Sequence, residues 1–175
     1  MSIDDLDPEV LTELGRVTWA AIKLENYTDS MCSTIDPSNP RTDRRSVGRK
    51  IVDAQMALRR WPPSPARDDA RAWLGQAGLA IESRNALLHA TPLVWVERGH
   101  QEEHRRFLLG EMPRKDRPYV ERPLTVASLA GLRTVLSEAT SGWRDLVIAV
   151  HIECERQRVA AASSEEDVSS PLPGG

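Results

Sequence analysis

Apolar side chains recur at heptad-like spacing along two long stretches of this chain, residues 8–32 and 125–160. This period places apolar side chains on one face of an α-helix. Each such face has to be buried against another helix, so the pattern favours a helical bundle. The repeating positions are Val10, Leu14, Val17, Ala21, Leu24, Thr28 and Met31 in the first stretch, and Leu129, Leu132, Leu136, Ala139, Trp143, Leu146 and Val150 in the second.

Capping residues and prolines predict where the helices begin and end. Asp7, Ser46 and Ser64 are suitable N-caps, and the first and third directly precede a proline. The turn-rich segment 36–43 separates the first two helices, and Thr91-Pro92 ends the third because proline disfavours helical geometry in the preceding residue. The expected helices cover residues 8–32, 65–89 and 125–160, together with a second helix that begins at Ser46 and is closed by Trp61-Pro62-Pro63.

A short insertion is expected between the third and fourth helices. Leu93–Val96 and Arg106–Leu109 are β-prone runs that indicate a small hairpin or a pair of extended arms. Gly142 is expected to kink the fourth helix. The predicted fold is all-α, a four-to-five-helix up-down bundle with this insertion, formed by one domain over 1–161 and a disordered tail over 162–175.

Length and composition fit a single globular domain without cofactor or metal. The chain has 175 residues, 40% of them hydrophobic, and its acidic N-terminus differs from a secretory signal. No apolar run approaches a membrane-spanning length, so a cytoplasmic protein without membrane contact is expected. Cys32 and Cys154 have no CxxC or Cys/His spacing, so reduced structural thiols are expected.

The charge distribution argues against a general nucleic-acid coat protein. Net charge is −3 and the pI is near 5.8, whereas such binding neutralises many phosphates. A basic run in the middle of the chain is more often a solvated face than an anion-binding surface. Its members are Arg41, Arg44, Arg45, Arg49, Lys50, Arg59, Arg60, Arg67 and Arg71.

Three polar residues crowd the last turns of the third helix, in the sequence Arg84-Asn85-Ala-Leu-Leu-His89. Cleavage of RNA by its own 2′-hydroxyl needs a proton-transfer group near neutral pH and a cation beside the phosphorane-like transition state. His89 suits the first task, because its ordinary pKa is about 6.5. Arg84 suits the second, because its planar fork fits phosphate oxygens. Asn85 lies one helical turn before His89 and could orient the ring or bind a phosphate or sugar oxygen.

This segment resembles the RNxxxH form of the Rx4-6H motif of the HEPN superfamily, small helical-bundle proteins that include metal-independent ribonucleases. The expected order of helices over residues 8–160 resembles that of the family as well. The resemblance implies an endoribonuclease of the toxin or antiviral defence kind, acting on a structured RNA such as tRNA. It also implies an antitoxin or other regulatory protein partner.

Helical geometry predicts that the site needs two chains. Arg84 and His89 are about 140° apart around an ideal helix, so one straight helix does not bring them together. Fraying of the helix end is one solution, and a second motif across a two-fold axis is the other. The resemblance implies the second, a homodimer whose two motifs line one cleft. Gly75, Gly78 and Ala86 would allow a partner helix to approach closely.

Two carboxylates are candidates to support the site. Glu82 lies on the same helix face as His89, two turns earlier, and Glu25 of the first helix could reach the same cleft if the two helices are neighbours; either carboxylate could orient the histidine or pair with Arg84. Solvated glutamates and surface ion pairs are commoner, and cations near a helix end are often there for the dipole alone. Among the remaining histidines, His100 and His104 are expected in a solvated turn, and His151 is expected either to face solvent or to cap a packing edge.

Two function classes therefore stay open. The first is a dimeric HEPN-type endoribonuclease with Arg84, Asn85 and His89 as catalytic residues. The second is a catalytically inactive HEPN-like module that binds RNA, a nucleotide or another protein. A purely structural helical dimer is a weaker third alternative.

Overall fold

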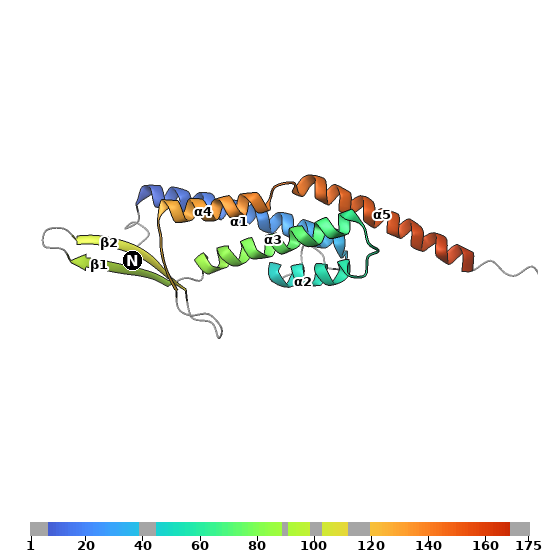
Figure 1. Cartoon of the computed structure of the whole chain (residues 1–175), viewed down its shortest axis with the longest axis horizontal. Coiled ribbons are helices and arrows are strands. Elements are labelled where there is room, and N and C mark those ends of the chain that lie inside the picture. The colour runs from blue at the N-terminus through green and yellow to red at the C-terminus, as the bar shows by residue number, and fades with distance from the viewer. Residues whose placement is uncertain (1–6, 39–44, 89–90, 99–102, 112–119, 169–175) are drawn as a thin grey trace, which may run out of the picture. The chain divides into compact units, whose positions relative to one another are not determined.

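The computed structural model describes residues 7–38, 45–88, 91–98, 103–111 and 120–168. Within them lie five helices and three strands (Figure 1). The helical character expected of the chain is confirmed, since helices cover most of the described residues. In chain order the elements are α1 (Pro8–Ile35), α2 (Val47–Leu58), α3 (Pro65–Leu88), β1 (Thr91–Arg98), β2 (Glu103–Glu111), β3 (Val120–Pro123), α4 (Val126–Ala139) and α5 (Trp143–Val168).

The predicted caps are present at the starts of the first three helices. The Asp7 carboxylate accepts a hydrogen bond from the Glu9 backbone N–H at 2.7 Å. The Ser46 hydroxyl accepts one from the Arg49 N–H, and the Ser64 hydroxyl accepts one from the Arg67 N–H. Each cap gives a side-chain acceptor to a backbone donor in the first turn of its helix.

The expected fourth helix is in fact two helices. Gly142 has φ +68°, in the left-handed region that ends a helix, and it separates α4 from α5. The predicted kink is therefore a complete break. The predicted tail also begins too early, because α5 continues to Val168 through the good helix formers Ala160 to Ala162.

The insertion is larger than the predicted pair of short runs. β1, β2 and β3 form an antiparallel sheet in that order, and β1 pairs with β2 from Thr91↔Gly110 to Arg98↔Glu103. β3, which was not predicted, pairs with β2 from Leu108↔Pro123 to Glu111↔Val120. Its four residues are too short for an alternating apolar pattern to identify.

The chain divides into two compact units, each made of two separate segments. Unit 1 comprises Met1–Asn26 and Gly75–Ser141, and unit 2 comprises Tyr27–Leu74 and Gly142–Gly175. Both unit boundaries near residues 26 and 74 fall inside helices, in α1 and α3. The predicted single domain over 1–161 thus stays a prediction.

Each unit has its own buried apolar side chains, to which the heptad-like repeats and helices α2 and α3 all contribute. In unit 2 the Tyr27 and Trp143 rings stack with centroids 4.1 Å apart, and the Trp143 indole donates to the Tyr27 carbonyl at 3.1 Å. The core of unit 1 includes Val17, Ala21, Leu24, Ala77, Ile81, Leu129 and Leu136. The core of unit 2 includes Met31, Cys32, Ile51, Ala54, Leu58, Leu74 and Val150.

Candidate functional site

Arg84, Asn85 and Glu25 meet in unit 1. Arg84 and Asn85 lie in the last turns of α3, where the Arg84 guanidinium donates a hydrogen bond to Asn85 Oδ1 at 2.9 Å. The same guanidinium forms an ion pair with the Glu25 carboxylate of α1. Of the two carboxylates considered from the sequence, Glu25 is thus the one beside Arg84, while Glu82 is exposed to solvent.

The Arg84 side chain is largely covered, with 15% of its surface exposed. Burial lowers the pKa of Arg84 below its ordinary value. Arginine nevertheless stays charged at neutral pH, because its ordinary pKa is far above 7. A cation is therefore held at the end of α3 by two neighbours, with a restricted choice of side-chain conformations.

His89 lies outside the described residues, directly after the last residue of α3. Its position relative to Arg84 and Asn85 stays a prediction. His100 lies outside the described residues as well, and His104 falls in β2. His151 is exposed on α5, in agreement with the solvent-facing alternative expected for it.

Several members of the basic run are neutralised by carboxylates within unit 2. Arg45 and Arg49 both contact Asp53, at 2.5 and 3.3 Å. The buried Lys50 ammonium lies 3.2 Å from Asp29, and Arg67 pairs with its neighbour Asp68. Paired cations attract external phosphate weakly, so these residues favour the ordinary structural interpretation of the run.

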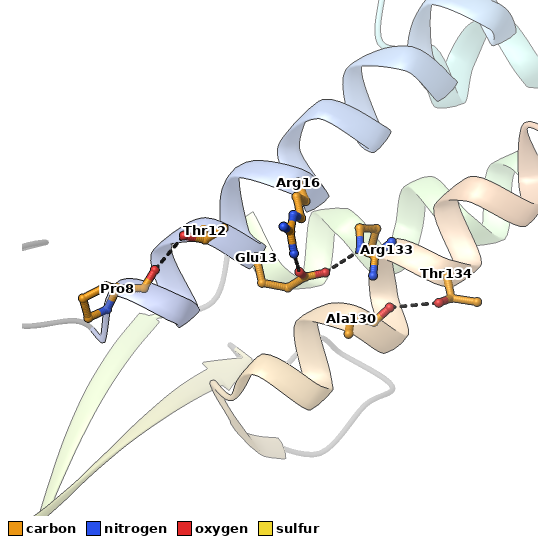
Figure 2. A network of polar contacts seen from close by, with 7 residues as sticks. All are labelled: Pro8, Thr12, Glu13, Arg16, Ala130, Arg133 and Thr134. Carbon is orange, nitrogen blue, oxygen red and sulfur yellow. Dashed lines mark hydrogen bonds and ion pairs between the residues drawn. The ribbon is translucent and has the colours of Figure 1, made fainter.

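A second polar cluster, in unit 1, was not anticipated. Glu13 is buried on α1, and its carboxylate accepts hydrogen bonds from Arg16 at 3.0 Å and from Arg133 of α4 (Figure 2). The hydrogen bond from Arg133 lowers the pKa of Glu13, against the opposing effect of desolvation. Glu13 also interrupts the apolar stripe, and Arg133 is 120 residues away in the chain, so periodicity could not reveal the pair.

Beside this cluster α1 and α4 enclose a groove of about 520 Å³. We call it the α1–α4 groove. Its lining is mainly cationic and hydroxyl-bearing, with one large aromatic side chain. The residues that line it are Thr12, Gly15, Arg16, Trp19, Ala20, Lys23, Arg133, Ser137 and Thr140. The spacing of Arg16, Trp19 and Lys23 along α1 was a signal in the sequence that the motif-based interpretation did not use.

The described residues contain neither a candidate metal site nor a helix that could span a membrane, and both cysteines are free. No group of three or more His, Cys, Asp or Glu side chains is placed there to hold a metal ion. Cys32 and Cys154 are free thiols, and burial raises the pKa of Cys32 to about 12. No described helix combines the length and the apolar character that crossing a bilayer requires.

Comparison with known proteins adds no relative. None of the protein-family models, curated proteins and solved structures compared with the chain matches it.

Proposed function

We propose that the chain is a metal-independent endoribonuclease of HEPN type, with Arg84, Asn85 and His89 as its catalytic residues. The observation that supports this most is the fixed arrangement of Arg84 between Glu25 and Asn85 at the end of α3. A cation held in advance stabilises a developing negative charge without reorganising during the reaction. The segment from Arg84 to His89 resembles the family motif, and this resemblance supports the rest of the proposal.

In the proposed reaction the ribose 2′-oxygen attacks the adjacent phosphorus, and the bond from phosphorus to the 5′-oxygen breaks. The products are a 2′,3′-cyclic phosphate and a 5′-hydroxyl. His89 takes the proton of the 2′-hydroxyl, and a second His89 from a partner chain gives a proton to the leaving 5′-oxygen. Arg84 donates hydrogen bonds to the phosphate oxygens, and Glu25 positions Arg84. Asn85 orients His89 or a sugar oxygen.

A homodimer belongs to this proposal, because one chain supplies one such histidine. The exposed side of α3 offers a suitable surface in unit 1. Gly75, Leu79, Glu82 and Ala86 follow helical spacing, and a side chain at Gly75 would meet nothing within 4 Å. Leu79 is 68% exposed and presents a large apolar side chain on this surface.

The alternative is a catalytically inactive HEPN-like module that binds RNA, a nucleotide or a protein. One specific observation favours it: the Arg84 guanidinium already has a carboxylate partner and is mostly covered. Arginines held in this way often serve the fold itself, since removing one partner leaves a poorly solvated charge.

Cleavage of a fluorogenic RNA by the full chain in EDTA tests the proposal. His89→Ala is expected to lower kcat by about 10²- to 10⁴-fold, the usual contribution of a proton-transfer group. Arg84→Ala is expected to lower it by about 10²- to 10³-fold, as for other charge-stabilising donors. The cleaved RNA should carry a 2′,3′-cyclic phosphate, which mass spectrometry identifies.

Two control variants show whether removal of any histidine or arginine lowers the rate, or only removal of His89 and Arg84. His151→Ala and Arg158→Ala change exposed residues of α5 and should retain the wild-type rate. Circular dichroism shows whether each variant keeps its helices. Equal cleavage by wild type, His89→Ala and Arg84→Ala would refute the proposal. RNA binding without cleavage, weakened by Arg84→Ala, would instead establish the binding module.

A further inference from the structure

Two arginines of the basic run, Arg59 and Arg71, keep their charges unpaired among the residues that the structure describes. Both are exposed, and neither side chain forms an ion pair or a hydrogen bond with a described residue. Arg59 is the C-cap of α2, where a cation is favourable beside the helix dipole, whereas Arg71 in the second turn of α3 has no such reason. The other described members of the run, apart from Arg60, contact carboxylates: Arg45, Arg49, Lys50 and Arg67.

Both arginines line a pocket between α2 and α3 in unit 2, which we call the α2–α3 pocket. Its volume is about 370 Å³, within the range of about 300–1,000 Å³ common for small-ligand sites. Two guanidinium groups from separate elements thus border one space, and a phosphate group has enough oxygens to accept hydrogen bonds from both. The residues that line the pocket are Gln55, Arg59, Asp68, Arg71 and Ala72.

Asp68 is the acidic member of this lining, and Arg67, which does not line the pocket, neutralises it. The Arg67 Nε and Nη2 atoms lie 2.9 and 2.8 Å from Asp68 Oδ1. Arg67 is fixed in turn, because only 19% of its side chain is exposed and its guanidinium donates to the Trp61 carbonyl at 3.3 Å. The pocket therefore keeps a net positive charge from Arg59 and Arg71. Since both contacts are to Oδ1, the Oδ2 atom of Asp68 can accept a further hydrogen bond.

Gln55 adds a neutral polar group next to the arginines. It lies one helical turn before Arg59 and is half-buried, and its side-chain amide forms no hydrogen bond with a described residue. An amide both donates and accepts, so it suits a hydroxyl as well as a phosphate oxygen. The lining residues include no aromatic and no large apolar side chain, so the pocket favours a polar ligand over a nucleobase or an apolar peptide.

We propose that the α2–α3 pocket binds a sugar phosphate, with the phosphate held by Arg59 and Arg71 and a neighbouring sugar hydroxyl donating to Asp68. A carboxylate repels a phosphate, so its place in the pocket suits a ligand that also offers a hydroxyl donor. A free sugar phosphate and the ribose phosphate of an RNA strand both present this chemistry. The inference does not depend on the proposed catalysis, because it concerns other residues, in unit 2, and equilibrium binding.

The first test is isothermal titration calorimetry of the full chain with ribose-5-phosphate. Arg59→Gln and Arg71→Gln should each weaken binding by roughly 10-fold, the usual effect of losing a hydrogen bond between two charged groups. Arg60→Gln is the matched control and should keep the wild-type affinity. Arg60 is exposed, adjacent to Arg59 and unpaired among the described residues, but it does not line the pocket. Because all three arginines are exposed, none of the changes should alter the thermal unfolding curve.

Asp68→Ala tests the hydroxyl contact separately from the phosphate contact. Methyl phosphate carries a phosphate without a sugar, and the variant should bind it at least as tightly as wild type, because a negative charge has been removed. The same variant should bind ribose-5-phosphate more weakly, because the acceptor for the sugar hydroxyl is gone. A variant that failed to fold would lose affinity for both probes, so opposite responses identify a specific effect.

A labelled oligoribonucleotide identifies the source of the ligand, with His89→Ala in the full chain so that the probe stays intact. If the source is RNA, Arg71→Gln should reduce the slope of log affinity against log salt by about 0.7, the value for one phosphate contact on a single strand. If the source is a free sugar phosphate, Arg71→Gln should leave RNA binding unchanged and weaken only ribose-5-phosphate.

Three results would overturn the inference. The first is a wild-type chain that binds neither ribose-5-phosphate nor RNA. The second is an Arg60→Gln variant that loses as much affinity as Arg59→Gln and Arg71→Gln, because the effect would then be one of general charge. The third is an Asp68→Ala variant that binds ribose-5-phosphate as tightly as wild type, since the sugar would then make no contact with Asp68.

Discussion

Glu13 shows how one residue can contradict the pattern of its helix. It lies on the buried face of α1, three residues after Val10 and four before Val17, and its charge is tolerated there because Arg16 and Arg133 donate hydrogen bonds to its oxygens. Burial of a carboxylate is unfavourable without such partners. The hydrogen bond from Arg133 keeps the pKa of Glu13 below its ordinary value of 4.5.

This lowered pKa predicts an acid-sensitive contribution to stability. Since the folded protein binds the Glu13 proton less tightly than the unfolded chain, the contribution is present above pH 4.5 and is lost as the pH falls through the folded pKa. The melting temperature of Glu13→Gln should therefore be lower than that of wild type at pH 7 and should decline less between pH 5 and pH 3.

Glu155→Gln is the control for this acid titration. Glu155 is exposed and pairs with Arg158, so this variant should follow the wild-type pH profile. If the melting profiles of Glu13→Gln and wild type differ by the same amount at every pH, the proposed titration of Glu13 is wrong.

At the scale of elements, the break between α4 and α5 depends on the backbone of Gly142. Both helices continue the same apolar spacing, so side-chain pattern does not distinguish them from one helix. The φ of +68° at Gly142 distinguishes two helices from one, because residues with a side chain rarely adopt this angle. One glycine therefore converts a predicted long helix into two.

Two glycine substitutions should have opposite effects. Gly142→Ala is expected to destabilise the protein by about 1 kcal/mol, because a side chain disfavours the left-handed region. Gly131→Ala should stabilise it by about 0.5–1 kcal/mol, because Gly131 is inside α4 and a new methyl group would meet nothing within 4 Å. Urea unfolding measures both free energies. A stabilising Gly142→Ala would show that the break does not require a positive φ.

At the scale of the whole molecule, the two compact units share helices α1 and α3. The Arg84 cluster and the α1–α4 groove both lie within unit 1, so each is defined without reference to unit 2. The exposed face of α3 around Leu79 belongs to unit 1 as well. Completion of the proposed catalytic site then depends on a second copy of the chain.

Light scattering tests that dimer. The wild-type mass should be twice the chain mass of 19.5 kDa, and Leu79→Glu should shift it to the monomer value because a charge cannot be buried unpaired at the interface. Val159→Glu is the matched control, since Val159 is 66% exposed on α5. A monomeric wild type at micromolar concentration, or a dimeric Leu79→Glu variant, would remove the two-chain site.

Local signals predicted the helix starts well. A cap needs a side chain within three residues of the backbone group that it satisfies, so Asp7, Ser46 and Ser64 could be identified directly. The strands were predicted less well, because β3 is short and its pairing with β2 depends on residues distant in the chain. The pairing of Arg84 with Glu25 was one of several possibilities in the sequence, and the structure selected it.

What the sequence determined by itself was the helical character of the chain and the stripes that form its cores, because periodicity and capping act over a few residues. Only the tertiary structure decided which charges meet. Glu25 with Arg84, and Glu13 with Arg133, are joined across 59 and 120 positions of the chain. Such contacts depend on which helices pack together, and local periodicity carries no information about the partner.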